Sequence, residues 1–160
     1  MIKHVFLIGP SYSGKNEFSK KLSILGYRHY SLGDICRSLK YPVRTSLKID
    51  DLEQLVLQHV DFSLPCIIDN IFKTADTVEI IDRLKKAGKI TDSSFVVLEI
   101  DDSTRKNIDF SKRRRQDDSQ IAIKRQQWTS QIAGIHRELQ QRHIDVHKID
   151  SIDGGFLLKF

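Results

Sequence analysis

A glycine-bounded turn near the start of the chain lies between a short apolar run and a helical pattern. The apolar run is Val5 to Ile8, and the helical pattern repeats at Phe18, Leu22 and Leu25. A strand, a turn and a helix in this order let backbone N–H groups and a helix N-terminus surround an anion. The candidate anion-binding residues are Gly9, Pro10, Ser11, Tyr12, Ser13, Gly14, Lys15 and Asn16.

The turn fits a phosphate-binding loop at its glycines and its lysine but departs from that pattern in the next two positions. Gly9 and Gly14 permit backbone angles that other residues avoid, and Lys15 adds a full positive charge. The pattern continues with Ser or Thr, whose hydroxyl binds Mg²⁺, whereas this chain continues with Asn16 and Glu17. Asn16 offers a carbonyl oxygen instead, and Glu17 brings negative charge. An ordinary turn with a chance glycine–lysine pair is the open alternative.

Composition and charge narrow the classes of function. The chain has 160 residues, the size of one domain, and a formal net charge of +5, which suits anionic partners such as nucleotides. Lys3 and His4 interrupt the first apolar run, so neither a signal peptide nor a membrane span is expected. Cys36 and Cys66 lack a metal-ligand spacing, which is typical of reduced cysteines in a cytoplasmic protein.

A basic run at Lys112 to Arg115 has two interpretations. Such a run could contact nucleic acid, but charge runs are more often solvated loops. No aromatic residues interleave with it, as a platform for stacking bases would need. The sequence therefore disfavours a nucleic-acid partner.

Apolar runs typical of buried strands alternate along the chain with helical patterns. The expected strands are 2–8, 29–31, 64–69, 95–100 and 144–149, and the expected helices are about 15–25, one opened by Gly33, one capped by Asp50 or Asp51, 77–87, and one from Asp117 or Asp118 to about 140. This alternation predicts an α/β fold. Its centre would be a five-stranded parallel sheet with helices on both faces and the first strand in the middle.

Polar residues follow three of these strands. They are the turn at 9–16, the segment Ser31 to Asp34, and Asp69, which ends a buried strand. Because ligands of parallel α/β sheets bind at the carboxyl ends of the strands, these groups are expected to form one site. Asp69 could merely cap the next turn, but its place beside a phosphate loop favours a metal role.

In their order along the chain, these motifs resemble those of the adenylate kinase and nucleoside monophosphate kinase family. Residues 9–15 are similar to its phosphate loop and residues 30–37 to its Ser-Thr-Gly-Asp-x-x-Arg segment. Residues 49–52, 67–73 and 115–118 resemble its Pro-Asp-Glu-Leu, Leu-Asp-Gly-Phe-Pro-Arg and Arg-x-Asp-Asp motifs. The resemblance covers nearly the whole chain and implies one three-layer P-loop NTPase domain over residues 1–160.

The resemblance implies roles on the donor side of a phosphoryl transfer. Lys15 and the loop amides would hold the phosphates of ATP, and Arg105 would lie against the donor base. Arg115 and Arg125 would neutralise charge on the transferring group, although Gln126 is the formal match to the second of these positions.

On the acceptor side, the resemblance implies that Arg37 and Lys73 hold the acceptor phosphate. Lys73 stands where the family has arginine, so a two-pronged contact becomes a point charge. Asp69, with Asp34 near it, would hold Mg²⁺, in part through water. The acceptor-binding segment, at about 31–60, is shorter than is usual in the family, and a short lid is expected at about 105–115.

Departures from the family pattern leave two classes of function open. Tyr12 replaces a loop glycine, Leu32 replaces a threonine, and Thr77 stands near the position of a base-reading glutamine. The first class is an ATP- and Mg²⁺-dependent kinase that phosphorylates a nucleoside monophosphate or a similar small acceptor. The second is a catalytically degenerate kinase fold that binds nucleotides or a protein partner as a scaffold. The residues retained at the predicted site favour the kinase.

Overall fold

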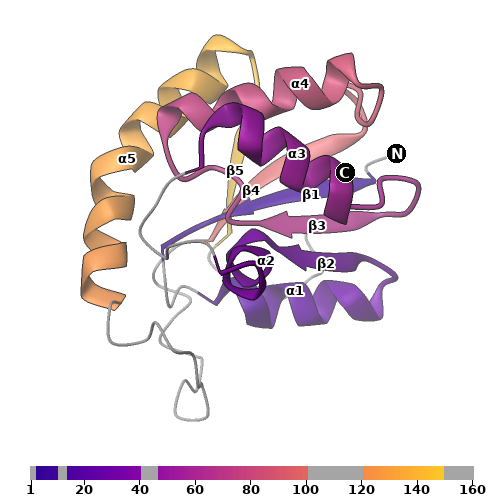
Figure 1. Ribbon diagram of the computed structural model, residues 1–160, viewed down its shortest axis with the longest axis horizontal. Helices are drawn as coiled ribbons and strands as arrows, with labels where there is room; N and C mark the ends of the chain where they lie inside the picture. The colour runs from indigo at the N-terminus through magenta and orange to yellow at the C-terminus, as the bar shows by residue number, and fades with distance from the viewer. Residues whose placement is uncertain (1–2, 11–13, 41–46, 101–120, 150–160) are drawn as a thin grey trace.

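The computed structural model describes residues 3–10, 14–40, 47–100 and 121–149 (Figure 1). Strands and helices alternate along these described residues, as the sequence predicts. The elements are β1 (His4–Ile8), α1 (Lys15–Ile24), β2 (Arg28–Ser31), α2 (Leu32–Ser38), α3 (Ile49–His59), β3 (Cys66–Asp69), the 3₁₀ helix η1 (Ala75–Glu79), α4 (Ile80–Lys86), β4 (Phe95–Ile100), α5 (Ile121–Gln141) and β5 (Val146–Ile149).

The five strands form one parallel sheet in the order β2-β3-β1-β4-β5. The predicted fold class and the central position of the first strand are both confirmed. Every residue of β1, β3 and β4 is buried, which explains why these strands are continuous apolar runs instead of alternating patterns. Because all the strand pairings are parallel, the five strands have their carboxyl ends at one edge of the sheet.

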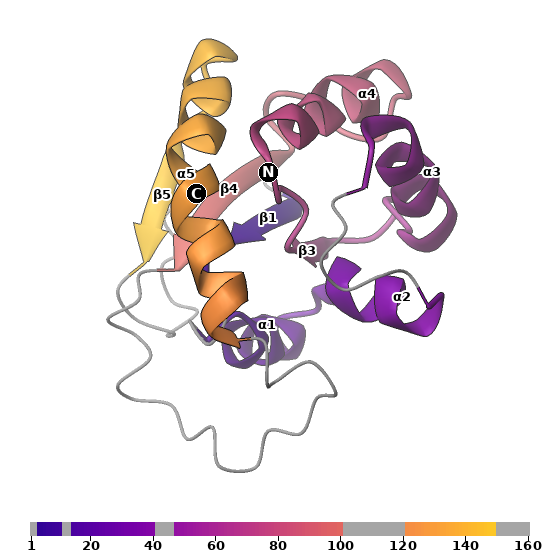
Figure 2. The same cartoon turned by 60° about the vertical axis from the view of Figure 1, so that its left-hand side comes forward.

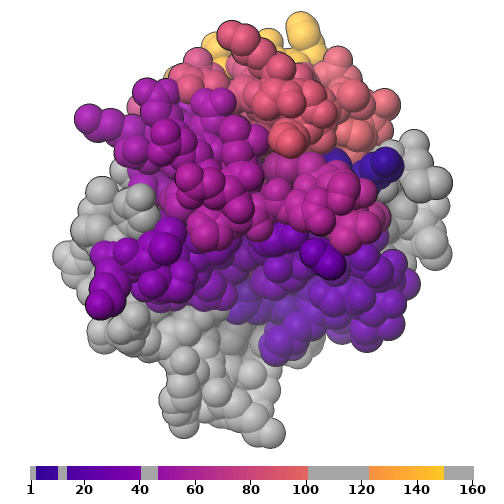
Figure 3. Space-filling model, turned by 45° about the vertical axis from the view of Figure 1, so that its right-hand side comes forward, coloured from indigo at the N-terminus to yellow at the C-terminus, as the bar shows by residue number. Residues whose placement is uncertain are grey.

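Side chains alternate between the two faces of the sheet, and each face has its own core. Val5 and Leu7 of β1 pack with Phe18 and Leu22 of α1. Phe6 and Ile8 face the opposite way, into a larger core that α3, α4 and α5 cover. Helices lie on both faces, as predicted, and the space-filling view shows α1 and β2 in violet along one side of α3 and α4 (Figure 3).

Two helix starts differ from the sequence prediction. Lys48, not an aspartate, is the N-cap of α3, because Asp50 lies inside the first turn and instead forms an ion pair with Arg83 of α4 at 2.7 Å. The helix expected from Thr77 begins two residues earlier as η1, where the Thr77 hydroxyl donates to the carbonyl oxygen of Thr74 at 2.7 Å. A tertiary ion pair at Asp50 and a capping hydrogen bond at Thr77 therefore accompany the two helix starts that differ from the prediction.

Helix α5 runs alongside β5 and crosses the sheet face that also carries α4 (Figure 2). Ile135 and Leu139 are fully buried in the core, and Trp128 is partly buried and packs against it. Gly134 lets the helix approach η1 closely, since a Cβ there would lie 3.2 Å from the Cβ of Ala75. The predicted start of this helix at 117 or 118 lies outside the described residues.

The described residues include no helix that is long and apolar enough to cross a membrane.

Candidate functional site

The predicted phosphate loop joins β1 to α1. Gly14 is the N-cap of α1 and has φ 102°, a left-handed conformation that glycine adopts without steric cost. The Lys15 ammonium donates to the carbonyl oxygens of Gly9, at 2.7 Å, and Pro10, at 2.9 Å. The Lys15 side chain therefore folds back over Gly9 and Pro10, the two described residues at the start of the loop. Ser11, Tyr12 and Ser13 lie outside the described residues, and their predicted roles stay predictions.

The positions after Lys15 are the ones that depart from the phosphate-loop pattern. Asn16 is half-buried in the first turn of α1. Glu17 forms an ion pair with Lys20 at 3.4 Å on the exposed side of the helix. A lysine one turn along the helix thus offsets the negative charge that Glu17 brings to the predicted phosphate site.

Asp69 ends β3 as predicted, and it is 3% exposed. Its Oδ2 lies 2.6 Å from Nε2 of His29 in the neighbouring strand β2. An ionised carboxylate only accepts hydrogen bonds, so His29 is the donor. Asp69 pairs in register with Leu7, whose side chain faces α1, so the carboxylate lies on the same face of the sheet as the helix that Lys15 begins.

The sequence analysis identified Asp69 but missed His29. The signal was present: His29 pairs in register with Ile67, two residues before Asp69, so strand alternation places both side chains on one face. Within the described residues no group of three acidic, histidine or cysteine side chains is arranged around one metal position. Mg²⁺ does not need such a group, because it keeps several waters and takes one or two carboxylates. Asp69, buried and hydrogen-bonded by His29, fits that requirement.

Asp34, the second predicted metal residue, lies in the first turn of α2 and is 58% exposed. It forms an ion pair with Arg37, one turn further along the same helix. This pairing orients the Arg37 guanidinium, which is only 15% exposed. A metal role for Asp34 stays a prediction.

The two predicted acceptor cations are Arg37, in the last turn of α2, and Lys73, which follows β3. Burial raises the pKa of the Cys36 thiol, and the positive charges of Lys73 and Arg37 partly offset that rise. Both cations therefore act on the same thiol. Arg37 and Lys73 thus lie within electrostatic reach of one side chain, and their acceptor role stays a prediction.

A residue that the sequence analysis did not single out lies beside them. Asn70 follows Asp69 with φ 64°, and its backbone N–H donates to the carbonyl oxygen of Leu7 at 3.1 Å. A Cβ built on Gly33 would lie 3.5 Å from Nδ2 of Asn70 and 3.4 Å from Nη1 of Arg37. The carboxamide and the guanidinium thus converge above Gly33.

The remaining predicted site residues have the following places. Arg125 is half-buried in the first half of α5, while Gln126 beside it is exposed. Thr77 and Leu32 are both buried, the first in the cap of η1 and the second in the core. Arg105, Arg115 and the predicted lid at 105–115 lie outside the described residues.

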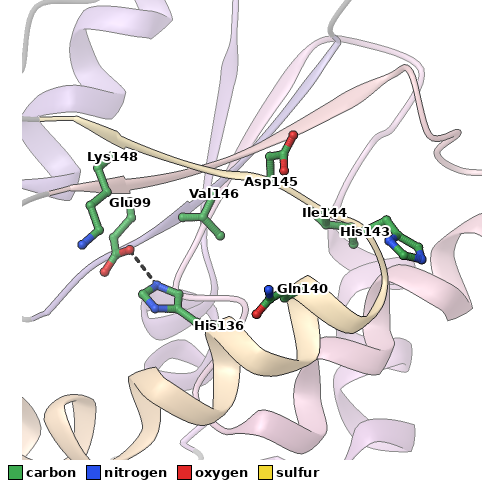
Figure 4. Close-up of a pocket in the computed structure, with 8 residues that line it drawn as sticks. All are labelled: Glu99, His136, Gln140, His143, Ile144, Asp145, Val146 and Lys148. Atoms are coloured by element: carbon green, nitrogen blue, oxygen red, sulfur yellow. Dashed lines mark hydrogen bonds and ion pairs between the residues drawn. The ribbon is translucent and has the colours of Figure 1, made fainter.

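A second carboxylate–histidine pair lies in a groove between α5 and β5 (Figure 4). Glu99 of β4 is 8% exposed, and its Oε2 lies 2.8 Å from Nε2 of His136. The groove has a volume of about 530 Å³, and Lys148 and Gln140 are among its lining residues. The sequence analysis missed this pair, although a glutamate inside the most strand-like run was a visible exception.

The fold has a known counterpart. The structure of shikimate kinase from Acinetobacter baumannii in complex with shikimate matches with a TM-score of 0.51 and 13% identity, over 96% of this chain and 86% of that chain. At this identity the likeness shows the fold alone, a parallel α/β sheet with helices on both faces that this chain shares with that kinase. No family model and no curated protein matches the sequence. The finer resemblance to adenylate kinases therefore stays a prediction.

Proposed function

We propose that this protein transfers a phosphoryl group from ATP to a small anionic acceptor, such as a nucleoside monophosphate. The observation that carries the proposal is the position of Lys15, whose ammonium lies against the carbonyl oxygens of Gly9 and Pro10 where α1 begins. A charged phosphate oxygen is a stronger partner for an ammonium than a neutral carbonyl, so ATP would displace both bonds. Lys15 would then hold the donor phosphates.

The acceptor side supplies the second reactant. Arg37 lies in α2, the helix that follows β2, and Lys73 lies in the segment that follows β3, so both come after strands that end at this edge of the sheet. An acceptor oxygen would attack the terminal phosphorus of ATP, the bond from that phosphorus to the bridging oxygen would break, and ADP would leave. This chemistry needs alignment and charge neutralisation more than covalent participation by the protein. Asp69 would hold Mg²⁺, which neutralises phosphate charge when bound.

The test compares two lysines of α1. Lys15→Ala removes a charged contact to phosphate, so ATP affinity should fall about tenfold or more. Lys21→Ala removes the same charge in the last turn of α1, where the lysine is exposed, and should leave ATP affinity unchanged. Isothermal titration calorimetry with ATP and Mg²⁺ measures both.

A coupled assay of ADP release with AMP, GMP, CMP, UMP and shikimate as acceptors then tests turnover by the wild type. Equal ATP affinity of wild type and Lys15→Ala would contradict the phosphate-loop role. Tight ATP binding with no acceptor phosphorylated at any Mg²⁺ concentration would instead favour the degenerate, nucleotide-binding scaffold.

A further inference from the structure

The backbone of Asn70 fixes the point from which its side chain leaves the chain. Asn70 has φ 64°, a region that residues other than glycine rarely adopt and that asparagine tolerates best. Its N–H bond to the carbonyl oxygen of Leu7, at 3.1 Å, ties this strained position to the central strand. The carboxamide therefore projects from a rigid point at the carboxyl edge of the sheet, one residue after Asp69.

Three nitrogen atoms converge where that carboxamide projects. Nη1 and Nη2 of Arg37 and Nδ2 of Asn70 lie 3.4, 3.5 and 3.5 Å from the point that a Cβ of Gly33 would occupy. All three atoms are hydrogen-bond donors. Donors from two separate elements that approach one point in this way match the several oxygens of a phosphate or a carboxylate.

Two cations and two carboxylates belong to this part of the chain. Arg37 and Lys73 are the cations, and both act on the Cys36 thiol. Asp34 is paired with Arg37, and Asp69, directly before Asn70, is hydrogen-bonded to His29. Asn70 adds donors without adding charge. It can therefore orient an anion that the two cations attract, and a point charge such as Lys73 does not supply that directionality.

We propose that Asn70 is an acceptor-binding residue, whose carboxamide donates a hydrogen bond to an anionic group of the molecule that is phosphorylated. The acceptor class is a small molecule with a phosphate or carboxylate group that fits between the Asn70 carboxamide and the Arg37 guanidinium. This inference rests on the proposed function, because it assigns the acceptor to the Arg37 and Lys73 side of the site.

Two substitutions isolate the carboxamide. Asn70→Gly keeps the left-handed backbone and removes the side chain, and Asn70→Asp keeps its shape but replaces the donor with a carboxylate. His143→Gly is the matched control, because His143 also has positive φ, 57°, and lies after α5, among the residues that line the groove. The control reproduces the backbone change without touching the acceptor side.

Calorimetry with AMP as the phosphate probe and shikimate as the carboxylate probe measures binding without requiring turnover. Loss of one hydrogen bond to a charged group should weaken the bound probe about 10- to 100-fold in Asn70→Gly. Asn70→Asp should weaken it further through repulsion. ATP affinity should stay within about twofold in both variants, and His143→Gly should match the wild type.

Unchanged probe affinity in Asn70→Gly would overturn the inference, and so would a wild type that binds neither probe. Parallel loss of ATP affinity would also overturn it, because the residue would then act on the whole site. A wild type that binds AMP through Asn70 but never phosphorylates it would keep this inference and remove the proposed function. The two failures are thus distinguishable.

Discussion

Two buried carboxylates lie at the ends of the strands on either side of β1, and each is bonded to one histidine. Asp69 of β3 contacts His29 at 2.6 Å, and Glu99 of β4 contacts His136 at 2.8 Å. Chemically the two pairs are almost the same. They differ in the face of the sheet on which they lie.

The face of the sheet on which each carboxylate lies determines which helix it lies next to. Asp69 pairs with Leu7 and lies on the face of α1, the helix that Lys15 begins. Glu99 pairs with Ile8, one residue further along β1, and lies on the face of α5, in the groove. A shift of one residue in a strand turns a side chain to the other face. Only the Asp69 pair is therefore expected to act on bound phosphates.

The largest expected effect comes from neutralising each carboxylate while keeping its shape. Asp69→Asn should lower turnover by about 100-fold or more, because it removes the charged oxygen that would hold Mg²⁺. Glu99→Gln, which makes the same change on the other face, should leave turnover within about twofold. The coupled kinase assay across a Mg²⁺ titration measures both, with circular dichroism as the check on folding. Equal losses of turnover in the two variants would mean that the face of the sheet does not determine the role of the carboxylate.

A smaller effect, on stability, should follow from removing each histidine. His29→Ala leaves the nearly inaccessible carboxylate of Asp69 without its donor, which should cost about 1–3 kcal/mol of unfolding free energy. His136→Ala should cost less than about 1 kcal/mol, because the side chain of His136 is 36% exposed and water can replace it. Urea denaturation at pH 7 gives both values. A larger loss in His136→Ala would reverse the comparison.

The smallest effect concerns a buried histidine whose partner is not a carboxylate. His4, at the other end of β1, has Nδ1 3.1 Å from Sγ of Cys66. Burial, with a smaller contribution from the positive charge of Lys3, lowers the pKa of His4. The unfolded chain therefore binds the proton more readily, so the stability due to neutral His4 is complete above pH about 6.5 and is lost as the pH falls below it.

Wild type should consequently lose more stability than His4→Gln between pH 7 and pH 5. Thermal unfolding at several pH values measures the difference. A variant that loses as much stability as the wild type would show that His4 does not titrate in this range. Only the two carboxylate–histidine pairs would then remain for comparing the effects of the buried histidines.

Much of the fold follows from the sequence because buried parallel strands have a simple signature. The runs that became β1, β3 and β4 are apolar on both faces, and glycines stop two helices, with φ 95° at Gly26 and 72° at Gly88. These apolar runs alternate with helical patterns, and only a few sheet topologies are compatible with that alternation. The central position of β1 could therefore be predicted from the sequence.

The site was less accessible to sequence reasoning because its decisive contacts join residues far apart in the chain. The bond from His29 to Asp69 requires knowing that β2 lies next to β3. The role of Asn70 requires its positive φ, which only the turn after β3 reveals. Asp50 looked like a helix cap until the structure placed Arg83 beside it.

The close approach at Gly134 has a mechanical consequence for the other end of α5. The helix touches η1 there, where a Cβ would lie only 3.2 Å from that of Ala75, so this point acts as the fulcrum of a long lever. Arg125 lies nine residues earlier, about 13 Å along the helix axis. A tilt of roughly five degrees about this contact would move Arg125 by about 1 Å. If Arg125 has its predicted role at the transferring group, a displacement of that size can cost about 100-fold in rate. The packing of Gly134 would then control the position of an arginine near the other end of the helix.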